Sequence, residues 1–442
     1  MPLHPVIDQT IHRTPLDAEG VVAFALSFLA VTVIAARRPA YGVAVMIALV
    51  PFAFYRDVGA TTITLPKVAL LANAVALLIA RKAPYALRRP AAATILVCGA
   101  LVVLGTALSI RAALYVEPAI RETFKSIEYL LLFSVVVVAT SCDPDRRPIR
   151  LALLGSVVLV GFLAIAQELT GAPSGVWFEN HPIPRIAGPL EGPNQLAGYL
   201  GIALAVVAAF ALRERFGAFE AAALGIGSCA LVLTISRAGV AASLAGIAIV
   251  FAVVPSPARR AAATAIGAGC AAGVLIIAAW GLYAAHAPAG VDLLLHFSST
   301  AESANPGSVG NRSQIWHAVF VLWSHHPFFG IGAGNFEREL GAAGYPKLHT
   351  HANSLYLQAL VEGGIPLAAA TVALVGASIA RFVRGPFDDA LVAAALGANV
   401  GLAIHQVFDL LVFYPKVGEL WWIVLALGAF ALDARTRATE VT

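Results

Sequence analysis

The sequence predicts an all-α protein, a polytopic bundle of about 12 (11–13) transmembrane helices. Hydrophobic residues make up 59% of the chain, charged residues only 12%, and the mean hydropathy is +0.82. A soluble domain is typically about 45–50% apolar and about 25% charged. Apolar segments near the length of about 20 residues that a membrane helix needs recur along the whole chain. Three of the four cysteines lie inside such segments, so no disulfide framework is indicated.

Thirteen apolar segments are candidate spans. They cover residues 21–36, 40–55, 64–80, 91–110, 127–141, 151–167, 195–212, 219–235, 238–254, 261–285, 353–381, 388–411 and 417–434. Gly363, Gly364 and Pro366 interrupt one of them and predict a broken helix there. The chain then divides into a first part of the bundle (1–285, with an outer loop at about 168–194), a periplasmic helical segment (286–352) and a last part of the bundle (353–442).

The basic residues predict the orientation. Lys and Arg cluster on alternate connections, so the clusters share one face, which should be cytoplasmic. The C-terminus then lies inside, and both long non-spanning segments lie outside. Thirteen spans place the N-terminus outside. If the first hairpin is not a pair of spans, the number becomes 12 and both ends lie inside.

Several cations fall on the outer side, where topology does not require them. They are Arg56, Lys67, Arg111, Arg121, Lys125, Arg185, Arg237, Arg312, Arg338, Lys347 and Lys416. Charges near membrane depth cost roughly 2.5–3.5 kcal/mol on insertion scales and usually mark function. Because the arginine fork donates paired hydrogen bonds to phosphate, this collection suggests an anionic substrate.

Two of these arginines stand in short motifs. In IPRIAGPLEGPNQLAGYL, Arg185 precedes Pro193-Asn194, and Asn194 is placed to cap a helix beginning near Gln195. A structural turn or a phosphate ligand at a helix start are the two interpretations. In SRAG, Arg237 interrupts an apolar run that is too long for one span, so it marks an outer turn and is either a turn marker or a functional charge.

Two amphipathic helices are predicted on the outer side. Arg312 begins one, with Ile315, Val319, Leu322 and Trp323 at helical spacing, and it is typical of a surface lid or a packing element. The GIGAG that follows lacks the strand–helix context of a dinucleotide loop. In the second, residues 111–129, Arg121, Lys125 and Glu128 share one face, which is either simply exposed or binds an anion.

The stretch HTHANSLYLQALVEGGIP places titratable groups at the outer mouth of a span. His349 and His351 precede Asn353, and a histidine there can serve as a general base or as a packing or capping residue. No carboxylate or cysteine set with ligand spacing accompanies them, so we expect no metal and no cofactor.

These motifs together resemble the O-antigen ligase and polymerase superfamily. The resemblance rests on R-x-x-G-x-x-x-x-PN, SRAG, GNR…W…P…GxGxxxF and the histidine stretch ahead of YLQALVEGG, in that order over about residues 185–366. It implies a metal-independent, inverting glycosyltransferase at the periplasmic face of the bacterial inner membrane. The family's histidine carries over to His351, with His349 as reserve, because Asn353 occupies the slot where the family often has histidine.

The resemblance also implies the substrates. An undecaprenyl pyrophosphate-linked glycan is the donor and a sugar hydroxyl of lipid A–core the acceptor, in contact with membrane lipid and without nucleic acid. Arg185, Arg237 and Arg312 would hold the pyrophosphate, with Arg121, Lys125, Lys67 and Asn194 as further candidates. A polysaccharide polymerase and a protein O-oligosaccharyltransferase are alternatives within the superfamily. A lipid-linked glycan transporter is the alternative from another class, although the chain shows no internal repeat.

Overall fold

The computed structural model confirms an all-α membrane protein. It describes residues 15–441 apart from 53, 59–60, 83, 173–176, 179–180, 183–184, 285–308, 347 and 349. Eight of its helices have a stretch long and apolar enough to cross a membrane: α1 (Ala18–Arg37), α4 (Pro90–Ser109), α5 (Val116–Cys142), α6 (Arg147–Thr170), α7 (Pro193–Arg213), α10 (Arg259–Ala284), α14 (Leu355–Val383) and α16 (Pro415–Val441). Five apolar helices are shorter: α2 (Pro39–Leu49), α3 (Leu65–Ile79), α8 (Ala218–Leu233), α9 (Arg237–Val253) and α15 (Ala390–His405).

Every predicted span coincides with one of these helices, but four boundaries were wrong by six residues or more. Helix α2 ends at Leu49 rather than at 55, and α16 continues to Val441 rather than ending at 434. Helix α5 begins at Val116, eleven residues before the predicted 127. Helix α15 ends at His405, whereas the prediction continued the span to 411. Residues 406–414 instead form turns and extended chain. The apolar Leu410, Leu411 and Val412 that suggested a span belong to this segment.

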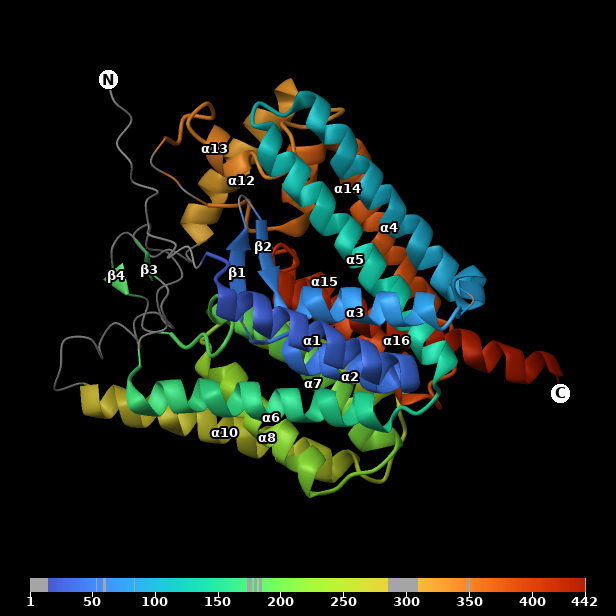
Figure 1. Ribbon diagram of the computed structural model, residues 1–442. Coiled ribbons are helices and arrows are strands. Elements are labelled where there is room, and N and C mark those ends of the chain that lie inside the picture. Colours follow the sequence, from blue (N-terminus) through green and yellow to red (C-terminus); the bar gives the residue numbers. More distant parts are fainter. Residues whose placement is uncertain are drawn as a thin grey trace.

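One end of the bundle, the basic end, collects arginines from distant parts of the chain. Arg38 is paired with Asp143 at 3.1 Å, and Arg146 contacts both carboxylate oxygens of Asp389 at 2.7 and 2.8 Å. Because these pairs join connections far apart in sequence, the alternate clusters do share one end, as predicted. Helix α16 finishes at the same end (Figure 1).

The opposite end, the hairpin end, carries the non-spanning elements. Strands β1 (Tyr55–Val58) and β2 (Thr61–Thr64) form one antiparallel hairpin, and β3 (Trp177–Phe178) pairs with β4 (His181–Pro182). Helices α12 (Val309–His325) and α13 (Phe336–Glu339) lie at this end as well (Figure 1). The Leu16 amide donates to the Asp57 carbonyl at 3.2 Å, which places the start of α1 there too.

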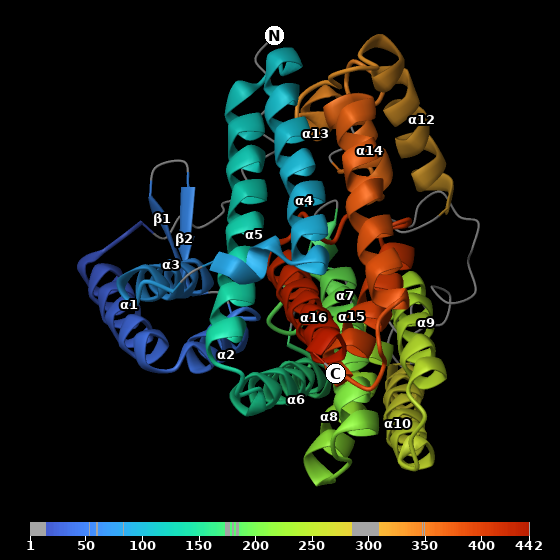
Figure 2. The same cartoon turned by 90° about the vertical axis from the view of Figure 1, so that its right-hand side faces the viewer.

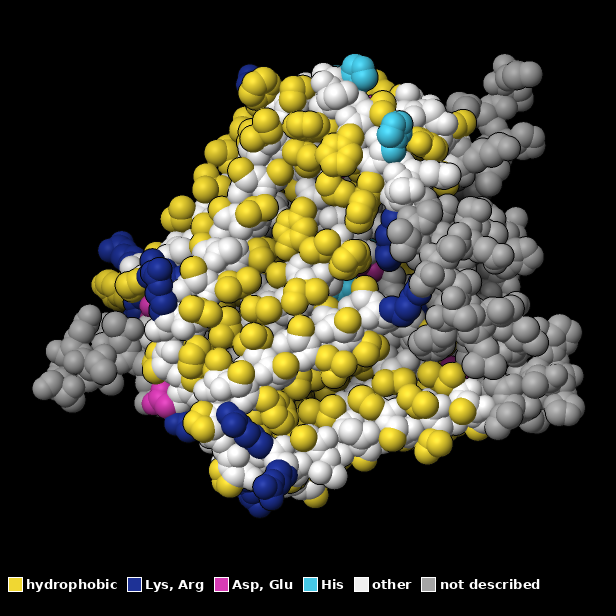
Figure 3. Space-filling view, turned by 180° about the vertical axis from the view of Figure 1, so that it is seen from behind, with side chains coloured by type: hydrophobic (Ala, Val, Ile, Leu, Met, Phe, Trp, Pro, Cys, Tyr) yellow, Lys and Arg dark blue, Asp and Glu magenta, His cyan; other side chains and the backbone are white. Residues whose placement is uncertain are grey.

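Helix α7 lies at the centre of the bundle, next to α8, α9 and α15 (Figure 2). In an apolar stretch of 18 residues of this helix, 94% of the residues are buried. Alanine, glycine and valine make this possible because their small side chains let neighbouring helices approach closely. Tyr199, the largest fully buried side chain, satisfies its hydroxyl with the Ser156 hydroxyl at 2.5 Å. The outer face of the bundle is broadly apolar, with Lys and Arg at its edges (Figure 3), as expected for a surface in contact with lipid.

A second, smaller core forms where α12 packs against the first half of α14. The residues predicted to form the apolar stripe of the amphipathic helix, Ile315, Val319 and Leu322, are buried in it. Val361 of α14 belongs to the same small core, whereas Leu374 further along α14 belongs to the main core. The two cores therefore meet along a single helix.

Helix α14 is broken at Gly364, as the sequence predicted. This residue has φ +65° and ψ −163°, and a side chain there would overlap the Phe328 carbonyl. The Ile365 amide donates to Pro327 at 3.0 Å, and the Glu362 carboxylate accepts from the Phe336 amide at 3.2 Å. The glycine-rich segment 330–334 is thus fastened to the break.

We predict that Gly364→Ala destabilises the folded protein. A left-handed backbone costs a residue with a side chain about 1–2 kcal/mol, and the overlap with Phe328 adds to this. The melting temperature of the purified protein in detergent should fall. Gly376→Ala, later in α14, is the matched control: a Cβ there meets no atom within 4 Å, so its melting temperature should not fall. Equal melting temperatures for both variants would contradict this account of the break.

Candidate functional site

Arg185 joins the first two sequence motifs at the hairpin end. Its Nε donates to the Thr234 carbonyl at 2.8 Å, and its Nη2 donates to the Asn194 side-chain oxygen at 3.1 Å. Burial lowers the pKa of Arg185 to about 10. The charge of Asp409 raises this pKa, whereas the charge of Arg237 lowers it further. The guanidinium is therefore still charged at neutral pH, with part of its donor set in use.

The prediction that Asn194 caps α7 was wrong. The helix begins at Pro193 with Gly192 at the N-cap position, so Asn194 lies inside the first turn. Proline suits that position because its missing amide hydrogen is not needed there. The Asn194 side chain is left to accept the hydrogen bond from Arg185.

Arg237 lies at the turn between α8 and α9, where the sequence placed it. Ser236 caps α9 by accepting from the Gly239 amide at 3.3 Å. Ile235 has φ +53°, a left-handed backbone that is unusual for a β-branched residue. The Arg237 side chain is exposed and makes no hydrogen bond or ion pair with any described residue.

Arg312 approaches the same place from α12. Burial lowers its pKa, while Asp409 raises it and Arg237 lowers it further. Since Asp409 and Arg237 also act on Arg185, the buried Asp409 carboxylate and Arg237 lie near both Arg185 and Arg312. Within the described part of the chain Arg312 has no bonded partner.

His351 lies beside this cluster, whereas His349 lies outside the described residues. The Asn353 amide donates to His351 Nδ1 at 3.2 Å, and His351 Nε2 is 3.3 Å from the Tyr414 hydroxyl. An amide can only donate, so a neutral His351 in this arrangement carries its proton on Nε2. Burial lowers the pKa of His351, and Asp409 and Glu337 oppose that shift. The imidazole is therefore neutral at pH 7.

The segment around His351 is held by its neighbours. Asn353 has φ +49°, which asparagine tolerates better than most residues. Ser354 caps α14 at the Leu357 amide, and the Ala352 amide donates to Gln358 at 2.6 Å. Glu362 and Gln358 of the YLQALVEGG motif thus have structural contacts that position the histidine and the glycine-rich segment.

Sequence reasoning missed four residues of the site: His405, Gln406, Asp409 and Tyr414. The error in the end of α15 placed His405, Gln406 and Asp409 inside a presumed span, and Tyr414 lies just beyond that span. Gln406 accepts from the Leu355 amide at 2.9 Å and the Leu411 amide donates to its side chain at 2.9 Å, so the segment 406–414 is docked on the start of α14. A lone aspartate in an apolar run was the available signal, because intramembrane carboxylates usually have a role.

Three predicted cations lie apart from the arginine cluster. Lys67 is paired with Glu128 at 3.1 Å, and Lys125 is paired with Glu122 and donates to the Phe413 carbonyl at 3.1 Å. Arg121 is exposed on α5 and has no bonded partner among the described residues. Among those residues, no group of three or more His, Cys, Asp or Glu side chains is arranged to hold a metal ion.

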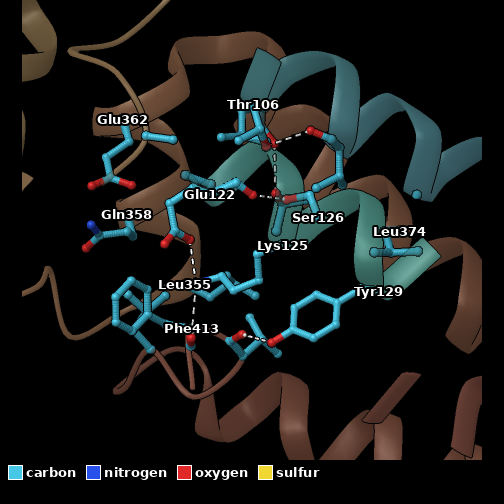
Figure 4. A pocket seen from close by; sticks show the side chains of 18 of the residues that line it. Thr106, Glu122, Lys125, Ser126, Tyr129, Leu355, Gln358, Glu362, Leu374 and Phe413 are labelled. Carbon is cyan, nitrogen blue, oxygen red and sulfur yellow. Dashed lines mark hydrogen bonds and ion pairs between the residues drawn. The ribbon is translucent and has the colours of Figure 1, made fainter. Parts of the chain in front are cut away.

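A largely apolar cavity of about 130 Å³ adjoins the site. It lies between α4, α5, α14 and α16, and Phe413 lines it on one side and contacts the His351 ring on the other, with ring centres 6.4 Å apart. Figure 4 shows Glu122 and Lys125 of α5 facing Gln358 and Glu362 of α14 across this space. An apolar chain in the cavity would end next to His351.

A family model described as O-Antigen ligase matches residues 222–372. The matched segment runs from α8 into α14 and includes Arg237, Arg312 and His351, but not Arg185 or Asp409. Curated protein sequences give no match to the chain.

Proposed function

We propose that the chain is an O-antigen ligase, because residues 222–372 match the O-antigen ligase family model, and members of that superfamily are glycosyltransferase-like enzymes. It transfers a glycan from undecaprenyl pyrophosphate to a sugar hydroxyl of lipid A–core, at the hairpin end and on the periplasmic side of the inner membrane. The main support is that Arg185 and Arg312 are both close enough to Asp409 and Arg237 to feel their charges, and that Asp409 also acts on His351, although long stretches of sequence separate them.

Arg237 and Arg312 bind the donor's pyrophosphate in this proposal. Both lack bonded partners within the described residues, so their full donor sets are available. Arg185 donates from Nε and Nη2 to the α8–α9 turn and to the start of α7. It contributes its positive charge to the site from a position behind the other two arginines. Preorganised guanidinium groups stabilise the charge that develops on a leaving pyrophosphate.

His351 takes the proton of the acceptor hydroxyl. The hydroxyl replaces the Asn353 amide at Nδ1 and donates there, while Nε2 remains against Tyr414. The acceptor oxygen forms a bond to the anomeric carbon as the bond from that carbon to pyrophosphate breaks, so one displacement inverts the configuration. Asp409 stabilises the resulting imidazolium, consistent with its effect on the pKa of His351.

The apolar cavity beside Phe413 receives the first part of the donor's polyprenyl chain. It lies inside the bundle and adjoins His351 through Phe413, so the chain and the pyrophosphate can be bound together. The unpaired cations Arg237 and Arg312 gather at one end rather than near the middle of the spans, which favours an enzyme over a lipid-linked glycan transporter.

The acceptor separates the ligase from its relatives. Purified protein is supplied with an undecaprenyl pyrophosphate-linked oligosaccharide, together with lipid A–core or without it. We expect glycosylated lipid A–core and no lengthening of the lipid-linked glycan. Longer lipid-linked products in the absence of lipid A–core would show a polymerase instead, and transfer only to an added protein acceptor would show an O-oligosaccharyltransferase.

We predict that His351→Ala lowers the transfer rate by about 10²–10⁴-fold, the usual contribution of a general base. In the unmodified protein the rate should be constant above neutral pH. It should fall as the pH drops below the lowered pKa of His351, because protonation then removes the base. His317→Ala, on the outer helix α12, is the control and should keep the rate and its pH dependence. A His351→Ala variant of normal activity would refute the base role.

Arg237→Ala and Arg312→Ala should each weaken donor binding by about 10- to 100-fold, since a hydrogen bond to a charged group contributes about 1.5–3 kcal/mol. Their melting temperatures should not change, because neither side chain bonds a described residue. Arg185→Ala should lower both donor affinity and melting temperature, since the buried Thr234 carbonyl loses its partner. Binding of a fluorescent polyprenyl pyrophosphate reports the affinity. Arg111→Ala, an exposed arginine at the same end, is the control, and an equal loss there would reduce the effect to general surface charge.

A further inference from the structure

A second cavity lies at the basic end, far along the bundle from the arginine cluster. Its volume is about 540 Å³, and the start of α6 and the turn between α7 and α8 form its walls. Arg146, Arg147, Arg150 and Arg215 line it together with Glu214 and Glu220. Nothing in the proposed transfer reaction uses this cavity.

The acidic residues of this cavity are already paired. Arg150 Nη1 is 3.4 Å from Glu214, and Arg150 Nη2 is 2.5 Å from Glu220. Arg150 Nε is buried and has no hydrogen-bond partner in the described part of the protein. Arg150 is therefore held by the two glutamates and offers no accessible donor to the cavity from Nε.

Two other cations are available to an anion in this cavity. The Arg147 and Arg215 side chains are exposed, and neither makes a hydrogen bond or an ion pair with a described residue. Arg146 is occupied by Asp389. Arg150 faces two glutamates, so these three residues together carry one negative charge, and Arg147 and Arg215 bring the cavity to a net charge of +1.

The cavity also has an apolar border. Leu151 is 48% exposed and Phe219 is 40% exposed, and both line it. They lie in the first turns of α6 and α8, where these helices begin beside the arginines. A ligand with an anionic head and apolar chains would therefore satisfy both parts at once.

We propose that this cavity binds the phosphate headgroup of an anionic phospholipid from the membrane leaflet at the basic end. The exposed Arg147 and Arg215 donate to the phosphate oxygens, and the acyl chains lie along Leu151 and Phe219. Basic pockets between membrane helices on the cytoplasmic side bind acidic lipid headgroups in this way. The proposal does not depend on the reaction at the hairpin end.

The test is retention of phosphatidylglycerol by the full-length protein. The protein is purified in detergent with phosphatidylglycerol or phosphatidylcholine, and bound lipid is measured by native mass spectrometry. We expect preferential retention of phosphatidylglycerol and at least about tenfold weaker binding in the Arg147→Gln, Arg215→Gln double variant, which loses two charge-assisted contacts. Because both side chains are exposed and unpaired in the described structure, an unchanged melting temperature confirms that the variant is folded.

The control removes two arginines elsewhere at the basic end. Arg259→Gln, Arg260→Gln lowers the net charge equally and should leave phosphatidylglycerol binding unchanged. An equal loss in this control, or equal retention of phosphatidylcholine by the unmodified protein, would overturn the proposal. Displacement of the lipid by millimolar inorganic phosphate would also overturn it, because the site would then be one for free phosphate.

Discussion

The candidate site depends on one buried guanidinium. Arg185 connects the chain before α7 to the turn after α8 by donating to Asn194 and Thr234. A charge removed from water must be compensated by hydrogen bonds and counter-charge, and here the Thr234 carbonyl, the Asn194 amide oxygen and nearby Asp409 provide both. The fold therefore determines where Arg237 lies, because the turn that carries it is held by Arg185.

The helices could be predicted from the sequence because long apolar runs have few alternatives in a membrane. The motif arginines and His351 could also be singled out, since charges in such a chain stand out. Asp409 could not, because the apolar residues after it extended a helical pattern that the structure ends at His405. Tyr414 lies between two predicted spans, and its contact with His351 is fixed by tertiary structure. The role of Asn194 was missed for a related reason: the capping pattern is local, while its actual partner, Arg185, is fixed by tertiary structure.

The two ends of the bundle use arginine differently. At the basic end, Arg38 and Arg146 are matched by aspartates from other connections, which fastens the loops together. At the hairpin end, Arg237 and Arg312 have no such partners within the described residues. Arg237 acts against the charge of Arg312, and Asp409 opposes that effect. Such an arrangement is less favourable for folding, and binding of a doubly charged ligand would relieve it.

The break in α14 separates the molecule into a large bundle and a small outer cap. Val361 and the segment from Ile331 to Leu340 belong to the cap, and Leu374 belongs to the bundle. His351 immediately precedes the cap side of that helix. The Leu355 amide and the Tyr356 hydroxyl donate to the Gln406 and Ala403 carbonyls, which ties this half of the helix to the end of α15. The imidazole is therefore held at the seam between cap and bundle, so a change in either one is felt at the same side chain.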